Sequence, residues 1–216
     1  MLSVSNITVE IKNFTILRGI SIEVADGEIV ALVGRNGAGK TTTLKSIMGL
    51  IPVSDGEIRL QSDDLLALAG HQRARLGVGY MPEERRLIGS LSVQDNIMMP
   101  AWAFKMAGAD KRLEYIYNLM PEISPFINRR ASMLSGGQQK MVALARALMS
   151  GNKILLLDEP FEGLAPALRA KFGETIQRLK GEGLTVLLAE SDTTSIGFVE
   201  NTYMIERGEN VGSVQT

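Results

Sequence analysis

Several residue types are scarce or missing in this chain of 216 residues. It contains no cysteine, one histidine and one tryptophan, and aromatic residues make up 5% of it. Without cysteine it can form neither a disulfide nor a thiolate metal site, which suits a reducing compartment. The single histidine, His71, lies in the polar stretch GHQRAR, and one histidine alone is too few ligands for a metal cage. We therefore predict that His71 is a surface residue.

An excess of one charge and long apolar runs are also missing. The 23 Lys and Arg residues are balanced by 24 Asp and Glu residues, so nothing indicates a nucleic-acid partner. The pairs Arg85-Arg86 and Arg129-Arg130 are interpreted as solvated surface. No apolar run approaches the roughly 20 residues that cross a bilayer, and the start, MLSVSNITVEIKN, lacks the pattern of a signal peptide. Any role at a membrane is expected to be peripheral.

The composition is that of a globular domain, with 45% hydrophobic and 22% charged residues. Three apolar runs, 29–33, 154–157 and 184–189, are typical of strands buried on both faces of a parallel sheet. Alternation within residues 2–30 and a short strand at 57–60 indicate an antiparallel patch beside that sheet. The predicted fold class is therefore α/β.

The chain, residues 1–216, is predicted to be one domain with an insertion. We interpret about 89–148 as a helical subdomain, because no convincing strand lies there, and about 1–88 and 149–216 as the core. The methionines of the insertion are interpreted mainly as core residues. An adaptable groove for a helix of a membrane subunit is the alternative. The residues concerned include Met98, Met99, Met106 and Met120.

A complete phosphate-binding motif follows the first apolar run. Residues 34–41 read GRNGAGKT, a full match to G-x-x-x-x-G-K-[ST] between a strand and a helix-like run. Backbone N–H groups of such a loop converge on phosphate oxygens, and the next helix adds its positive dipole end. Lys40 is expected to bridge the β- and γ-phosphates, and a hydroxyl of Thr41 to bind Mg²⁺. The candidate nucleotide-binding residues here are Gly34, Arg35, Asn36, Gly37, Ala38, Gly39, Lys40, Thr41 and Thr42.

Two acidic residues end the second apolar run. The stretch ILLLDEP places Asp158 and Glu159 at the carboxyl end of a buried strand, where ligands of open α/β sheets bind. Asp158 is expected to hold Mg²⁺ directly or through water, and Glu159 to activate the attacking water as general base. A strand that simply runs into a helix is the plainer alternative, and the phosphate-binding motif argues against it.

The stretch LSGGQQKMVALARAL, residues 134–148, predicts an amphipathic helix from Gln138 onward. The residues before it, Ser135-Gly136-Gly137, are an unusual helix start, because each glycine inside a helix costs about 1 kcal/mol relative to alanine. They can place hydroxyl and N–H donors against a γ-phosphate. Since the phosphate-binding motif of the same chain already holds the phosphates from one side, this suggests a second copy. A simple N-cap with glycines for tight packing is the alternative.

The order of these motifs, with LSGGQ about twenty residues before ILLLDEP, resembles the ATP-binding cassette (ABC) family over essentially the whole chain. The resemblance implies a P-loop fold with a parallel central sheet, an antiparallel β edge subdomain and an inserted helical subdomain. It also implies hydrolysis of ATP with Mg²⁺ by a head-to-tail dimer of identical or similar ATPase subunits. Each ATP lies between the P-loop of one subunit and the signature residues of the other. These signature residues are Leu134, Ser135, Gly136, Gly137 and Gln138.

Four stretches resemble the ATPase subunits of importers of branched-chain or hydrophobic amino acids and of their urea-type relatives. They are residues 71–87, 91–97 and 155–166 and the Glu-x-Asp of LLAESD. The resemblance implies a peripheral subunit at the cytoplasmic face of the inner or plasma membrane. It would drive transmembrane permease subunits that are fed by a substrate-binding protein.

Three positions depart from the general pattern of the family. Glu83 replaces the usual glutamine and is interpreted as a sensor of Mg²⁺, water and the membrane partner, with a solvated loop carboxylate as the alternative. Ser191 stands where a histidine or glutamine is usual, and it acts through a water or contributes little, which leaves Glu159 as the main hydrolytic group. Ala165 stands where an aspartate is usual, which fits the amino-acid importer group.

The aromatic residue that stacks on adenine in the family is missing at its usual position. Ile11 occupies that position, and Phe14 is the nearest ring, so both are candidates for the adenine contact. The chain also ends at ERGENVGSVQT, earlier than the family pattern usually runs. We therefore expect an accessory C-terminal segment to be absent or removed.

Two other functions remain open at this point. A cassette ATPase without a transport role, such as a mechanical clamp in cell division, would have a similar length. A small-molecule kinase would transfer the phosphoryl group as a monomer and would leave LSGGQ without a purpose.

Overall fold

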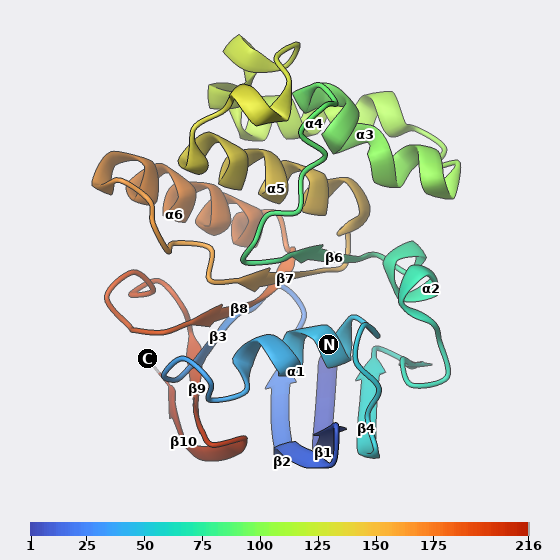
Figure 1. The fold of residues 1–216 in the computed structure, drawn as a ribbon, viewed down its shortest axis with the longest axis vertical. Helices are drawn as coiled ribbons and strands as arrows, with labels where there is room; N and C mark the ends of the chain where they lie inside the picture. The colour runs from blue at the N-terminus through green and yellow to red at the C-terminus, as the bar shows by residue number, and fades with distance from the viewer. Residues whose placement is uncertain (216) are drawn as a thin grey trace.

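The computed structural model describes residues 1–215; Thr216, the last residue of the predicted domain, lies outside them. Two sheets organise the molecule (Figure 1). The larger sheet has six strands in the order β10-β9-β3-β8-β7-β6, parallel from β9 to β6, with β10 antiparallel at one edge. Its strands are β3 (Ile29–Val33), β6 (Val78–Met81), β7 (Ile154–Asp158), β8 (Thr185–Glu190), β9 (Asn201–Glu206) and β10 (Glu209–Gln215).

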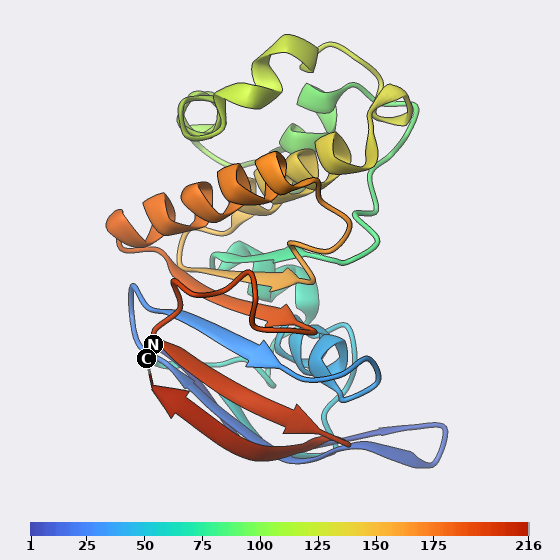
Figure 2. The ribbon, with the colours of Figure 1, turned by 90° about the vertical axis from the view of Figure 1, so that its left-hand side faces the viewer.

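The smaller sheet is antiparallel and has the order β2-β1-β4-β5. Its long first hairpin projects beyond the body of the molecule (Figure 2). The strands are β1 (Leu2–Ile11), β2 (Phe14–Val24), β4 (Asp55–Leu60) and β5 (Asp63–Asp64).

Helices cover both faces of the parallel sheet. In Figure 1, α5 and α6 lie above it with α3 and α4 beyond them, and α1 lies between it and the antiparallel sheet. None of the helices in residues 1–215 combines the length and apolarity needed to traverse a bilayer. The helices are α1 (Lys40–Ile47), α2 (Gly70–Arg75), α3 (Val93–Phe104), α4 (Ala109–Leu119), α5 (Gly136–Ser150), α6 (Pro166–Gly181) and the 3-10 helices η1 (Pro121–Phe126) and η2 (Ala131–Met133).

Strands β3, β7 and β8 are buried on both faces because they lie between two separate apolar cores. Alternate residues of β7, Leu155 and Leu157, pack into the core formed with α3, α5 and α6. Their neighbours Ile154 and Leu156 pack into the core shared with α1 and the antiparallel sheet. A strand between two cores has no solvent face, which explains its unbroken apolar sequence.

The predicted α/β fold with its parallel sheet, antiparallel edge and helices is confirmed, and two corrections concern the start of α5 and a hairpin that the sequence did not predict. Helix α5 begins at Gly136 and not at Gln138, because Ser135 caps it: Gln138 N donates to Ser135 Oγ (3.3 Å) and Ser135 N donates to Gln138 Oε1 (3.0 Å). The β9–β10 hairpin was not predicted. Its strands are only partly buried and lack an apolar run, which is why the sequence pattern did not predict them. The turn residues Arg207-Gly208 were the sequence feature that could have indicated a hairpin.

Candidate functional site

The phosphate-binding loop joins the end of β3 to α1. Gly39 is the N-cap of α1 with φ 115°, and a Cβ there would lie 2.7 Å from Leu17 Cδ2. Gly37 has φ 84° and open space around it. A left-handed backbone of this kind favours glycine. The loop leaves Lys40 as the first residue of α1, buried at 4% exposure, with its Nζ donating to Gly34 O at 2.7 Å.

Asp158 ends β7 directly beside α1. Thr41 Oγ1 donates to Asp158 Oδ1 (2.9 Å), and Tyr80 from β6 donates through its hydroxyl to Oδ2 (3.2 Å). Burial raises the pKa of Asp158, and these two hydrogen bonds oppose the shift. The sequence predicted a shared magnesium site for Thr41 and Asp158, and the structure brings the oxygens of these two side chains together. Tyr80 was not predicted here.

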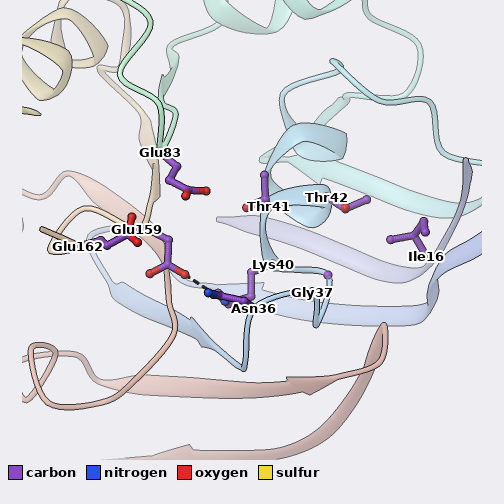
Figure 3. Close-up of a pocket in the computed structure, with 10 residues that line it drawn as sticks. Ile16, Asn36, Gly37, Lys40, Thr41, Thr42, Glu83, Glu159 and Glu162 are labelled. Atoms are coloured by element: carbon purple, nitrogen blue, oxygen red, sulfur yellow. Dashed lines mark ion pairs between the residues drawn. The ribbon is translucent and has the colours of Figure 1, made fainter.

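Glu159 is the centre of a buried polar cluster. Its Oε1 lies 3.1 Å from Lys40 Nζ and accepts a hydrogen bond from Ser191 Oγ at 2.6 Å, and Ser191 N donates to its Oε2 at 3.2 Å. The Lys40–Glu159 ion pair is drawn in Figure 3. Ser191 Oγ also lies 2.9 Å from Asn36 Oδ1, which connects it to the phosphate-binding loop. Glu159 has φ 46°, a left-handed conformation that costs a non-glycine residue about 1–2 kcal/mol.

A cavity of about 520 Å³ lies over these groups. Three of the lining side chains, Glu83, Glu159 and Glu162, are carboxylates (Figure 3). Burial raises the pKa of Glu83, and the neighbouring carboxylates of Glu162, Asp158 and Glu159 raise it further. This concentration of negative charge opposite one lysine fits a cation brought in with a phosphate ligand. The full lining is Ile16, Asn36, Gly37, Gly39, Lys40, Thr41, Thr42, Glu83, Glu159 and Glu162.

Chemically, these oxygens fit Mg²⁺. The ion prefers oxygen ligands and is usually bound by one or two protein groups together with substrate phosphates. In residues 1–215 no group of three His, Cys, Asp or Glu side chains is arranged to hold a metal by itself. Thr41 and Asp158 therefore suit a metal that arrives with a nucleotide.

Two predicted adenine contacts lie outside the cavity. Ile11 and Phe14 face each other at the end of the β1–β2 hairpin, 38% and 73% exposed, and neither lines the cavity. Ile16 does line it. Since alternate residues of a strand share a face, Ile16 lies on the same side of β2 as Phe14. This two-residue spacing could have identified Ile16 from the sequence as a candidate for the cavity.

The remaining loop residues border a second cavity. Gly34, Arg35 and Ala38 lie there with Ile205 and Arg207, in a space of about 530 Å³. Asn36 and Gly37 line both cavities. The loop thus separates the two spaces, and the Lys40 side opens to the acidic cavity.

The predicted signature residues do not line the main cavity. Leu134 is buried in the core, whereas Ser135 and Gly136 are exposed at the start of α5. A Cβ on Gly137 would lie 2.4 Å from Leu168 Cδ2, so the end of this half-buried side chain would have to shift to make room for it. Ser135 thus caps α5, as the alternative interpretation of this stretch expected, and the exposed face at Ser135 and Gly136 stays available to another molecule.

The surface predictions hold for His71 and the Arg129-Arg130 pair, which are exposed, but not for Arg85. Arg85 is half-buried, and its Nη1 donates to Gln139 Oε1 of α5 at 3.1 Å. The reason is a left-handed turn at Arg85 and Arg86, with φ 65° and 49°, which folds the segment against α5.

Comparisons with known proteins agree with this architecture. The family model described as "ABC transporter" matches residues 17–162. The branched-chain amino acid transport ATP-binding protein BraG of Pseudomonas aeruginosa is 35% identical over 212 residues, which cover 98% of this chain and 91% of that protein. The lipopolysaccharide export ATP-binding protein LptB of Escherichia coli K12 is also 35% identical, over 96% of this chain and 87% of that protein.

Solved structures give the same result. A dimeric structure of the bacterial ABC transporter cassette MJ0796 has a TM-score of 0.89 and 26% identity, covering 100% of this chain and 98% of that chain. A dimeric post-hydrolysis state of the same cassette, with ADP and Pi bound, matches equally well.

The fold and the site define an ATP-binding cassette, an ATPase of the P-loop type. The chain belongs to the ABC transporter family. Cassettes of this family form dimers and work with transmembrane permeases.

Proposed function

We propose that this chain is the ATP-hydrolysing subunit of an importer for branched-chain or other amino acids or a related small solute. The observation that carries the hydrolytic part is the convergence of Lys40, Thr41 and Glu159 on one cavity. Asp158 lies behind Thr41 and accepts a hydrogen bond from its Oγ1 at 2.9 Å. The importer part is supported by the resemblance to BraG and to LivF of Archaeoglobus fulgidus, which is described as a probable branched-chain amino acid transport protein and is 32% identical over 91% of this chain and 84% of that protein. The equal identity to LptB makes lipopolysaccharide export the competing candidate.

In the proposed site, the residues of the chain divide the work of phosphoryl transfer to water. Lys40, which is paired with Glu159 at 3.1 Å, transfers its contact to the β- and γ-phosphates when ATP binds. Glu159 is then free to accept a proton from the water that attacks the γ-phosphorus, and ADP leaves. Bound Mg²⁺, held by Thr41 and Asp158, would neutralise charge on the phosphates. Ser191 holds the Glu159 carboxylate through its Oγ.

Other residues that the sequence predicted receive supporting roles in this proposal. The backbone of the phosphate-binding loop and Thr42 would contact the phosphates, and Glu83, which lines the same cavity, would contact the metal and the water. Ile16 is proposed as the apolar contact nearest the nucleotide, in preference to Ile11 and Phe14.

We place the second half of each nucleotide site on a partner subunit. Ser135 and Gly136 are exposed at the N-terminus of a helix of fifteen residues, where N–H groups and the helix dipole favour phosphate. This chain's own cavity does not use them. A second copy or a similar subunit therefore supplies the signature in trans.

The domain division and the membrane contact belong to the same proposal. We divide the chain into a core of about 1–88 and 149–216 and a helical subdomain of about 89–148, within which α3, α4 and most of α5 lie. Between the two parts lies an apolar cavity of about 360 Å³, lined among others by Leu50, Met99 and Phe104. It suits a helix of the permease, which would hold the chain at the cytoplasmic face of the membrane.

Two experiments test the proposal. The purified chain carrying Glu159→Gln should bind ATP, lose hydrolysis and form dimers that the chain without nucleotide does not form. A Glu159→Gln form that hydrolyses ATP normally would refute the assignment of the base, and one that stays monomeric with ATP and its membrane partners would refute the shared site.

The transport role is tested in the source cells. Loss of the chain should abolish uptake of labelled leucine or of another small solute, and restoring it should rescue uptake. Unchanged uptake together with defective lipopolysaccharide transport would favour the export alternative. Co-purification with a cell-division complex in place of permeases would favour the non-transport cassette.

A further inference from the structure

Lys140 is a buried lysine that the proposed chemistry does not use. It lies in α5, is 3% exposed, and its Nζ donates to the backbone oxygens of Glu159 (2.6 Å) and Glu162 (2.5 Å). Among the described residues, none of the ion pairs within 4.0 Å involves Lys140. A buried ammonium is costly unless hydrogen-bonded, so its position between two carbonyl groups calls for an explanation.

The segment that Lys140 holds is the one that carries the proposed general base. Glu159 has the left-handed φ of 46°, and its carbonyl oxygen also accepts a hydrogen bond from Glu162 N at 3.3 Å. Within the same segment, Phe161 N donates to the buried Glu190 at 2.9 Å. A strained backbone conformation persists only where surrounding contacts stabilise it. Lys140 supplies such contacts at both ends of the segment 159–162, through its hydrogen bonds to the carbonyl oxygens of Glu159 and Glu162. Figure 3 shows Glu159 and Glu162 together at the cavity.

The same lysine lies near the start of the signature helix. Gly136 and Lys140 are four residues apart in α5, so they share one face of the helix. Lys140 lies roughly 7–8 Å along the helix axis from the N-cap Ser135, at 1.5 Å per residue. A rigid helix turn therefore connects the exposed residues that are proposed to meet the partner's nucleotide with the backbone on which Glu159 is mounted.

We propose that Lys140 is a positioning residue that couples the signature helix to the general base, by fixing the carbonyl groups of Glu159 and Glu162. The inference rests on the proposed function, in which Glu159 is the base and Ser135-Gly136 contact nucleotide in trans. Through this link, the placement of α5 by a partner-bound nucleotide sets the Glu159 carboxylate for attack.

The test compares three variants of the full chain with one control. Lys140→Met keeps the length of the side chain but loses every donor, whereas Lys140→Gln and Lys140→Arg keep donors for the carbonyl groups. The control is Lys171→Met on α6, an exposed lysine that pairs with Glu122 at 3.3 Å. The measurements are kcat and KM for MgATP, at a protein concentration at which the dimer forms, and thermal melts.

If Lys140 positions the base, K140M lowers kcat at least tenfold with KM within twofold of the unchanged chain, and K140R or K140Q restores at least a third of kcat. If K140M is not folded at the assay temperature, Lys140→Ala replaces it, and the same limits on kcat and KM apply. The shorter side chain lets water bond to the two carbonyl groups, but water does not hold them in place. A folded K140M or K140A with kcat within twofold of the control overturns the proposal.

A double-mutant cycle separates positioning from general stability. In a chain that already carries Glu159→Gln, K140M should leave the residual rate unchanged within twofold, because Lys140 acts through Glu159. A full tenfold further loss in that background would show that Lys140 acts elsewhere and would overturn the inference. If Glu159→Gln alone keeps normal hydrolysis, it is the proposed function that fails.

Discussion

The buried carboxyl group of Glu190 predicts an unusual dependence of stability on pH. Glu190 ends β8, is 5% exposed and accepts a hydrogen bond from Phe161 N. Burial raises the pKa of Glu190 from 4.5 to about 8, the charge of Glu159 adds to this, and the hydrogen bond from Phe161 opposes it. Since the folded chain binds this proton more tightly than the unfolded chain, the stabilisation is fully present below pH 4.5 and is lost as pH rises toward 8.

The size of the effect follows from the shift. One pKa unit corresponds to about 1.4 kcal/mol, so the contribution that disappears between the two pKa values is on the order of a few kcal/mol. Glu190→Gln keeps an acceptor for Phe161 N but carries no ionisable group. We expect the variant and the unchanged chain to have similar free energies of unfolding near pH 5. Between pH 5.5 and 7.5, the advantage of the variant in free energy of unfolding should grow by roughly 2–3 kcal/mol.

The assay is urea unfolding of both proteins between pH 5 and pH 9, with Tm from calorimetry as a second measurement. At about 2–4 °C per kcal/mol for a chain of this size, the Tm difference should grow by roughly 5–10 °C between pH 5.5 and pH 7.5. Glu174→Gln on the exposed side of α6 is the matched control and should follow the unchanged chain. Parallel curves for Glu190→Gln and the unchanged chain would refute the reasoning, because they would mean that Glu190 does not hold a proton in the folded state.

Three further predictions concern the site and the signature helix. Glu159→Gln should lower single-turnover ATP hydrolysis at least a hundredfold while ATP binding, measured by calorimetry, stays within threefold; loss of binding would mean that Glu159 holds the nucleotide. Ser191→Ala should lower kcat about three- to tenfold, because Glu159 loses its 2.6 Å hydrogen bond, and no change in kcat would show that Ser191 contributes little. Gly136→Ala, which meets only the flexible end of Arg85, should leave the free energy of unfolding unchanged or raise it by up to about 1 kcal/mol. Gly137→Ala should be less stable than Gly136→Ala by roughly 1 kcal/mol, because the end of Leu168 must shift to accept the new Cβ; equal effects on urea unfolding would contradict the packing argument.

Much of the fold could be predicted because its signals are local. Three stretches show both the kind of element and where it begins or ends: IVALV, GRNGAGKT and ILLLDEP. Strands β3 and β7 and the start of α1 were therefore predicted nearly to the residue. The β9–β10 hairpin was missed because partly buried edge strands lack such a run. The start of α5 was misplaced because the side chain of Ser135 makes a cap that lets glycines begin a helix.

The contacts inside the site required the tertiary structure. Residue types and spacing identified Lys40, Asp158 and Glu159 as candidates, but not the ion pair between Lys40 and Glu159, nor the hydrogen bonds of Ser191 to Glu159 and of Tyr80 to Asp158. These contacts join segments far apart along the chain, and they exist because the strand order places β3 next to β8 and β8 next to β7.

By itself, the sequence determined the elements that short-range chemistry specifies: the glycine loop that exposes backbone donors, the lysine and threonine after it, and the acidic pair that ends a buried strand. Only the tertiary structure decided which side chain meets which. It placed Ile16 and not Phe14 at the cavity, put Leu168 against Gly137, and brought Lys140 to the carbonyl groups beside the base. The physical reason is that a motif constrains only neighbours along the chain, whereas these contacts depend on how packed sheets and helices bring distant residues together.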